Sequence, residues 1–283
     1  MNAEVVLDAR ARVGESPVWD VRERRLRWVD VPAGVIHSFD PAGGQDSAQS
    51  AGQPVGSLAL RENGGLALAV RDGFAALEAG VVRMLVPVES SRPSNRMNDG
   101  NVDPQGRFWA GTMDVDMRAD AGALYRLDAD HQVHRMLAPV SVSNGIDWNL
   151  DGTLMYFVDS GAGTVSAFNF DGPTGAISGR RSICEIAASE GLPDGLTVDA
   201  EGFIWVAVWG AGVVRRLAPD GTLAASVSVP VTQVTSCAFG GDDLSTLFIT
   251  TAAGGVESVE PQAGGLFACR PGPAGCAPNR FLG

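Results

Sequence analysis

The 283-residue sequence predicts an all-β protein folded as a six-bladed β-propeller. Three observations predict this fold: a turn-plus-aromatic unit that recurs along the chain, a regular spacing between its copies, and short β-rich runs without a long amphipathic helix. Gly is also abundant, with 36 residues, as expected of a chain with many tight turns.

The recurring unit is a polar turn that leads to an aromatic or apolar residue. It is clearest in residues 103–109 (Asp-Pro-Gln-Gly-Arg-Phe-Trp) and 199–205 (Asp-Ala-Glu-Gly-Phe-Ile-Trp), which share the same internal spacing. Looser copies occupy residues 24–28, 62–66, 150–156 and 241–248. Gly supplies the positive φ of the hairpin turn, and the aromatic residue can wedge between blades. We therefore expect Trp28, Trp109 and Trp205 to be packing residues rather than a substrate platform.

The spacing of the unit gives the number of blades. Its aromatic or apolar anchors fall near positions 28, 67, 109, 156, 205 and 248, so successive gaps are 39 to 49 residues. Periods of this size are typical of solenoids, propellers and related arrays. Short β-rich runs such as 26–31, 65–70 and 203–208 favour a four-stranded antiparallel blade. The sequence thus predicts a single domain over residues 1–283, with six blades of about 47 residues each.

Composition argues against several classes of function. The net charge is −12 and no basic run is present, so we expect no binding to nucleic acid or to an anionic membrane. All 21 basic residues are Arg, which leaves no Lys for a Schiff base, pyridoxal phosphate or a Walker-type phosphate loop. The chain also lacks a G-x-S-x-G nucleophile elbow and a dinucleotide fingerprint.

The N-terminal residues and the cysteines indicate the compartment. The first residues contain no basic and apolar leader pattern, and no apolar run approaches a membrane span, so we expect a cytoplasmic protein. The four cysteines form no C-x-x-C pair, which favours a reduced protein, although a pairing of Cys269 with Cys276 stays open. We expect a monomer or a weak homo-oligomer.

Four polar residues stand beside Gly or Pro at the entrance to apolar strands. Glu15, Asn98, Asn144 and Asp194 are separated by 83, 46 and 50 residues, close to two, one and one blades. Because corresponding loops of a propeller converge on its axis, these side chains would ring one central pocket. Carboxylate and amide oxygens there suit Ca²⁺, Mg²⁺ or Mn²⁺, and can also take Zn²⁺. The alternative is that the Asn-Gly and Asp-Gly steps only form turns.

These segments resemble the SMP-30/gluconolactonase/regucalcin family of sugar lactonases over nearly the whole chain. Each motif alone is weak evidence for the family, but all of them together, in the same order along the chain, make the resemblance strong. The matching segments are 14–19, 95–113, 143–148, 193–195 with 199–202, and the shorter 122–125, 237–241 and 263–267.

The resemblance implies a propeller with one divalent metal ion on its axis, either Ca, Zn, Mn or Mg. By position, Glu15, Asn144 and Asp194 would be the metal ligands, and Asp194 would also be the catalytic base. Arg96 and Asn98 would contact the substrate.

Two positions depart from the family pattern. Asp116 stands where the family often has Glu, one methylene longer, which puts its substrate contact in doubt. Ser16 stands where Gly is common, a change that we expect to be tolerated.

The expected reaction is hydrolysis of a sugar lactone, a gluconolactone-like aldonolactone, with the metal polarising the carbonyl and Asp194 activating water. Arg96, Asn98 and Asp116 would read the sugar hydroxyls. One alternative is an aryl-ester or organophosphate hydrolase on the same propeller, and another is a non-enzymatic calcium-binding or interaction propeller. The combination of a base with Arg96 favours the lactonase.

Overall fold

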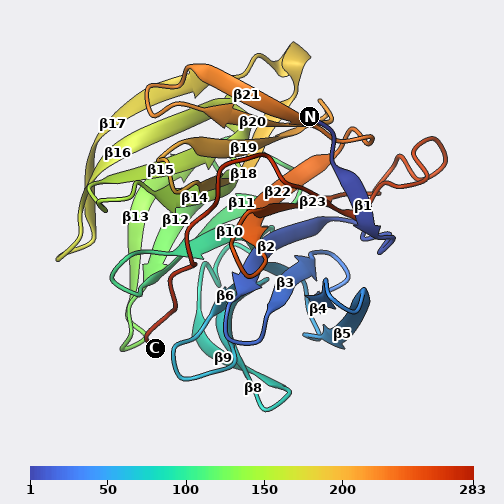
Figure 1. Cartoon of the computed structure of the whole chain (residues 1–283). Helices are drawn as coiled ribbons and strands as arrows, with labels where there is room; N and C mark the ends of the chain where they lie inside the picture. The colour runs from blue at the N-terminus through green and yellow to red at the C-terminus, as the bar shows by residue number, and fades with distance from the viewer.

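The computed structural model describes all 283 residues, and it confirms the predicted all-β six-bladed propeller. Its 24 strands form six four-stranded sheets arranged around a common centre (Figure 1). The strands are β1 (Glu4–Leu7), β2 (Gly14–Asp20), β3 (Arg25–Asp30), β4 (Val35–Asp40), β5 (Gln45–Ser50), β6 (Val55–Leu60), β7 (Leu66–Val70), β8 (Gly73–Glu78), β9 (Val81–Pro87), β10 (Asn95–Val102), β11 (Phe108–Asp114), β12 (Gly122–Leu127), β13 (Val133–Val140), β14 (Ser143–Trp148), β15 (Leu154–Asp159), β16 (Thr164–Asp171), β17 (Ala176–Glu185), β18 (Leu192–Val198), β19 (Ile204–Trp209), β20 (Val213–Leu217), β21 (Leu223–Ser228), β22 (Val234–Gly240), β23 (Thr246–Thr251) and β24 (Leu266–Cys269).

Five blades are antiparallel meanders of four consecutive strands: β2–β5, β6–β9, β10–β13, β14–β17 and β18–β21. The first strand of each blade is the inner one, and neighbouring inner strands contact each other around the ring, with β22 meeting β2. We call the face where the inner strands begin the front face, and the face where they end the back face.

The sixth blade joins the two ends of the chain. It is ordered β1-β24-β23-β22, so the N-terminal strand is the outermost strand of a blade whose other strands come from the C-terminal part. The register pairs Glu4 with Ala268 and Val5 with Phe267. This pairing closes the ring through backbone hydrogen bonds between β1 and β24. The sixth blade is complete only when the N-terminal strand meets the C-terminal strands.

The predicted anchors all lie in the second strand of their blade. These are Trp28 in β3, Ala67 in β7, Trp109 in β11, Tyr156 in β15, Trp205 in β19 and Phe248 in β23, and each is buried. The six hydrophobic clusters of the core each combine side chains from two neighbouring blades. The anchors are therefore the apolar filling between blades, as expected of packing residues.

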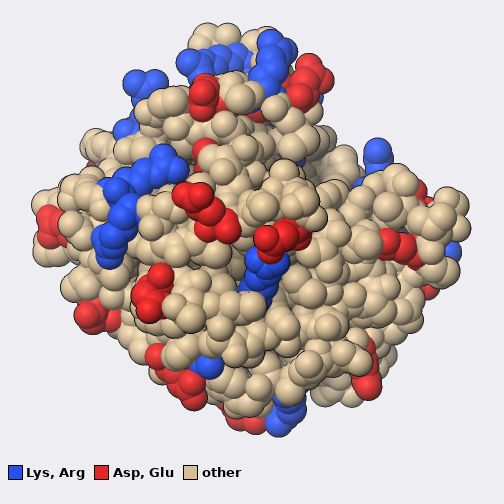
Figure 2. Space-filling model, turned by 90° about the horizontal axis from the view of Figure 1, so that it is seen from above, with Lys and Arg blue, Asp and Glu red and all other residues tan.

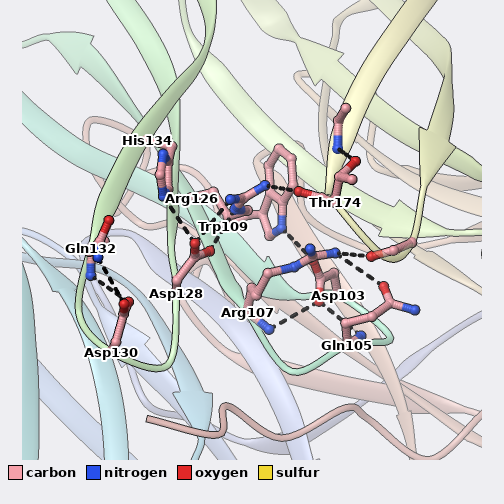
Figure 3. Close-up of polar contacts among 12 residues, drawn as sticks. Asp103, Gln105, Arg107, Trp109, Arg126, Asp128, Asp130, Gln132, His134 and Thr174 are labelled. Carbon is pink, nitrogen blue, oxygen red and sulfur yellow. Dashed lines mark hydrogen bonds and ion pairs between the residues drawn. The ribbon is translucent and has the colours of Figure 1, made fainter.

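The clearest sequence repeat is a turn organised by one carboxylate. Asp103 accepts the indole N–H of Trp109 at 2.9 Å, and its other oxygen accepts the backbone N–H of Gln105 and Arg107 at 2.9 and 3.0 Å (Figure 3). Asp199 makes the equivalent bonds, including one from the Trp205 indole at 2.9 Å. The fixed spacing of Asp, Gly and Trp thus satisfies the buried polar atoms of each turn.

Two arginines extend this turn to the next blade. The Arg107 side chain donates to the carbonyl of Gly172 at 2.9 Å, and Arg126 donates to that of Thr174 at 2.8 Å. Arg126 also holds Asp128 with both arms of its guanidinium (Figure 3). Charge-assisted bonds to backbone carbonyls therefore connect the third blade to the β16–β17 turn of the fourth.

After β24 the chain runs across the back face as an irregular tail, residues 270–283, drawn in dark red in Figure 1. The backbone N–H of Gly275 donates to Leu244, the amide of Asn279 donates to Val102, and the N–H of Phe281 donates to Leu60. The tail thus links the sixth, third and second blades.

The only helical segments are the 3₁₀ turns Ser160–Ala162 and Ala188–Glu190. Accordingly, no helix has the length and apolar character needed to cross a membrane. All four cysteines are free thiols. Figure 2 shows one face of the molecule, over which arginines are interspersed with acidic side chains.

Candidate metal and substrate site

Every inner strand contains an irregularity in its pairing near the front face. The register with the second strand shifts between residues 15 and 18, 55 and 57, 97 and 100, 143 and 146, 193 and 196, and 234 and 236. Such β-bulges take residues out of the hydrogen-bond ladder and re-aim their side chains. Each inner strand therefore has such a bulge near its front end.

The predicted polar residues occupy four of these bulges. Asn98, Asn144 and Asp194 lie inside the shifted segments of β10, β14 and β18, and Glu15 begins the shifted segment of β2. The expectation that they sit in loops before the strands was wrong in this detail. Gly and Pro beside them mark bulges within strands, where an unpaired residue tolerates either.

The two asparagines are in direct contact. The side-chain amide of Asn98 donates to the Asn144 Oδ1 at 3.0 Å and to the Ser143 carbonyl at 2.8 Å. Both side chains are buried. The ring therefore brings together residues that are 46 positions apart, as the blade spacing predicted.

Ser160 fixes the orientation of Asn144, and sequence reasoning missed it. Its hydroxyl donates to the Pro193 carbonyl at 2.6 Å, so its oxygen is left to accept the Asn144 side-chain amide at 2.7 Å. The Asn144 oxygen must then point the other way, toward Asn98. Ser160 lies in a 3₁₀ turn outside the repeat, so no spacing signal marked it.

Glu15 and Asp194 form the acidic part of the site. Burial raises the pKa of Glu15 well above its ordinary range, and the charges of Asp194 and Asp99 raise it further. Burial also raises the pKa of Asp194 well above its usual value, again with a contribution from Asp99. The Asp194 Oδ1 is buried without a hydrogen-bond partner. The backbone N–H of Ser16 donates to Glu15, and Gly195 provides a backbone hydrogen bond to Asp194, but these donors do not offset the cost of burying two neighbouring carboxylates.

Asp99 is a third buried carboxylate that the sequence prediction did not include. Burial raises its pKa to about 7, against the backbone N–H of Gly100, which favours the ionised form. It follows Asn98 inside the same bulge, and consecutive residues of a bulge can escape the alternation of a regular strand. In the sequence, the only sign of this role was the position of Asp99 directly after the predicted site residue Asn98.

Arg96 is the cation of the cluster. Its guanidinium donates to the Asn98 Oδ1 at 2.6 Å and to the Met97 carbonyl at 3.0 Å. Burial lowers the pKa of Arg96, while Glu15 and Asp194 act in the opposite direction. Its charge in turn lowers the pKa of both carboxylates. Arg96 therefore belongs to the same group of side chains as the predicted ligands.

Asp116 occupies a different position at the front face. It lies in the loop between β11 and β12, residues 115–121, and its side chain is 74% exposed. Its carboxylate lies 3.6 Å from Arg118, and its backbone N–H donates to Asp114 at 2.9 Å. The structure thus places Asp116 outside the buried cluster, and its contact with substrate stays a prediction.

The donor set fits a hard divalent cation. Glu15 and Asp194 offer carboxylate oxygens, Asn144 offers an oriented amide oxygen, and the free Oδ1 of Asp194 lacks any other partner. No group of three or more His, Cys, Asp or Glu is arranged to hold a metal, so an Asn oxygen is essential to this fit. A cation would also offset the buried negative charge that raises both pKa values.

A cavity of about 240 Å³ extends along the axis behind the bulges. Asp99, Asp147 and Ser236 line it, and tail residues 276–279 lie at its back end. Glu15, Asn144 and Asp194 do not line this cavity. The candidate ligands therefore lie apart from this cavity, in the bulges near the front ends of the inner strands.

The fold and the site define a β-propeller with a buried, oxygen-lined site on its axis. The chain belongs to the family described as "SMP-30/Gluconolactonase/LRE-like region", which matches residues 13–253. It is 39% identical to regucalcin of Xenopus laevis over 99% of this chain and 98% of the relative, and 41% identical to regucalcin of Gallus gallus over 93% and 92%. A solved structure described as a calcium-binding protein, regucalcin, from Agrobacterium tumefaciens has a TM-score of 0.94 at 29% identity, covering 99% of this chain and 97% of that one.

Proposed function

We propose that this protein is a metal-dependent lactonase that hydrolyses a gluconolactone-like aldonolactone to the aldonic acid. The observation that carries the proposal is the unpartnered, buried Oδ1 of Asp194 in a cluster with Glu15, Asn144 and the cation Arg96. Membership of a family whose description includes gluconolactonase supports the same reaction class.

Glu15, Asn144 and Asp194 would hold one divalent cation, Ca, Zn, Mn or Mg. When bound, such a cation supplies a Lewis acid for the lactone carbonyl and for the negative charge that develops on it. Asp194 has a carboxylate oxygen that no protein donor occupies, so it can take the proton of the attacking water.

Arg96 and Asn98 supply the polar groups for the sugar. The Arg96 guanidinium presents further N–H donors beyond those held by Asn98 and Met97, and these suit ring hydroxyls or the new carboxylate. Asn98 is held between Arg96 and Asn144, so its position is fixed before substrate arrives. Asp116 would approach the substrate from the front-face loop.

A calcium-binding protein without catalysis is the second candidate, because one similar structure is described as a calcium-binding protein. The partly buried guanidinium of Arg96 disfavours this alternative. A positive charge in the cluster repels a cation, which a purely cation-holding site would avoid, whereas a lactone's hydroxyls and product carboxylate make use of it.

The test is hydrolysis of D-glucono-δ-lactone by protein freed of metal and then given each of the four cations, with proton release as the readout. We expect no activity without metal and recovery with at least one cation. Full turnover by verifiably metal-free protein would contradict the metal's role. Calorimetric cation binding without hydrolysis of any aldonolactone would favour the calcium-binding alternative.

A further inference from the structure

A buried carboxylate lies outside the axial cluster, at the front face. Glu89 is in the connection between β9 and β10, and its side chain is only 7% exposed. Its backbone has φ of 54°, a left-handed conformation that Glu rarely adopts. Such strain persists only where the surrounding structure fixes the residue.

The contacts of Glu89 explain what fixes it. One carboxylate oxygen accepts the Asn95 side-chain amide at 2.7 Å, and the other accepts the Tyr125 hydroxyl at 2.9 Å. The same Asn95 amide donates to the Ala121 carbonyl at 2.8 Å. Each oxygen of the carboxylate therefore has its own donor, and Asn95 connects it to a second loop.

That second loop carries Asp116. Loop 115–121 is tied at its far end by Asn95 and by Arg92, whose guanidinium donates to the Ala121 carbonyl at 2.9 Å. At its near end, the backbone N–H of Val115 donates to the Ser94 carbonyl at 2.8 Å. Segment 92–95, which leads directly into Arg96, thus holds both ends of the loop.

We propose that Glu89 is a positioning residue which, through Asn95 and Tyr125, holds loop 115–121 beside the entrance to the axial site and so sets the affinity for polyhydroxylated lactones. Its effect on affinity rests on the proposed function. Glu89 orders the polar groups of the loop and of Arg96 before binding, so substrate does not have to order them itself. This ordering strengthens binding of the distal sugar hydroxyls. It does not affect the reacting carbonyl.

The kinetic test compares Glu89→Ala, Glu89→Gln and Tyr125→Phe on gluconolactone and on δ-valerolactone, which has the same ring without hydroxyls. We expect Glu89→Ala to raise KM for gluconolactone roughly 10-fold, with kcat within about 2-fold of the wild-type value. KM and kcat for δ-valerolactone should not change. Glu89→Gln should have a smaller effect, because its amide oxygen can still accept from Asn95. Glu201→Gln, an exposed carboxylate on the back face, is the control.

Hydrogen exchange of residues 115–121 is the readout that does not depend on activity. We expect the backbone amides of this loop to exchange faster than in the wild type in all three variants, with the largest increase in Glu89→Ala. The control variant should exchange at the wild-type rate. Unchanged exchange, or an equal loss of kcat on both lactones, would overturn the proposal. If the wild-type protein hydrolyses no lactone, the proposed function and the affinity claim fail together, while exchange still decides whether Glu89 holds the loop.

Discussion

Two aspartates of the inner strands show how hydrogen bonding separates a fully bonded carboxylate from one with a free oxygen. Asp147 accepts the backbone N–H of Trp148 and of Val198 and the hydroxyl of Thr197. Asp194 is buried, yet one of its oxygens has no donor. The satisfied carboxylate connects two inner strands, and the unsatisfied one is available to a cation, a water or a substrate.

Asp194→Asn should reduce kcat roughly 10³-fold, because the proposed general base is lost. The fold should persist, since the amide has the same shape and removes a buried charge that the metal-free protein cannot compensate. We also expect a divalent cation to raise the melting temperature of the wild-type protein, and to raise that of the variant by less. Steady-state kinetics and thermal unfolding with and without cation measure both effects. Near-normal turnover would exclude Asp194 as the base.

Asp147 should make stability depend on pH. Burial raises its pKa from 3.8 to about 6, against the opposing hydrogen bonds from Trp148, Val198 and Thr197. The folded protein therefore retains the proton to higher pH than the unfolded chain, and its stability falls as pH rises from about 4 through 6. Relative to Asp147→Asn, the wild type should lose about 2 kcal/mol between pH 4 and pH 6, and about 3 kcal/mol in total from well below to well above this window. Urea unfolding of both proteins at several pH values measures this loss. A difference in unfolding free energy that does not change with pH would contradict the prediction.

The blade elements owe their geometry to turns on the back face and bulges at the front. In the Asp103 and Asp199 turns, one carboxylate satisfies the backbone and the indole of the following strand, so an aromatic can be buried between blades without an unpaired N–H. The sequence showed this as a spacing of residue types. The bulges were harder to foresee, because Gly and Pro beside polar residues are equally typical of loops.

Asp103→Ala should lower the free energy of unfolding by about 3 kcal/mol. The substitution leaves the indole N–H of Trp109 and the Nε–H of Arg107 without an acceptor. The back face lies away from the site, so kcat should not change. Denaturant unfolding measures the loss, with exposed Asp242→Ala as the control. A loss no greater than that of the control would mean that the turn holds without its carboxylate.

At the scale of the whole molecule, the ring is held together by the two ends of its chain. Strand β1 completes the sixth blade, and the tail crosses the back face to the second and third blades. Phe281 is fully buried there, with its ring 6.4 Å from that of Phe108. The tail thus fills an apolar site between blades that the propeller strands themselves leave open.

Phe281→Ala should cost about 3–5 kcal/mol of stability, as large-to-small changes of buried aromatics do. The neighbouring Leu282→Ala is the matched control, because Leu282 is 52% exposed and should change stability by less than about 0.5 kcal/mol. Thermal and denaturant unfolding compare the two. Similar small losses in both variants would show that the tail contributes little to ring stability.

The sequence by itself determined the number of blades, the buried anchors, and the identity of Glu15, Asn98, Asn144 and Asp194 as residues that converge. These follow from local chemistry, since turn residues and strand periodicity repeat at a fixed interval. Arg96 came from the family resemblance, and the structure places it in the same cluster.

Only the tertiary structure decided which atoms meet. Ser160 orients Asn144, Asp99 adds a third buried charge, and Glu89 holds a loop through Asn95. None of these belongs to the repeat that marks the blades. Such partners depend on ring closure and on side-chain direction, which composition and spacing do not encode locally.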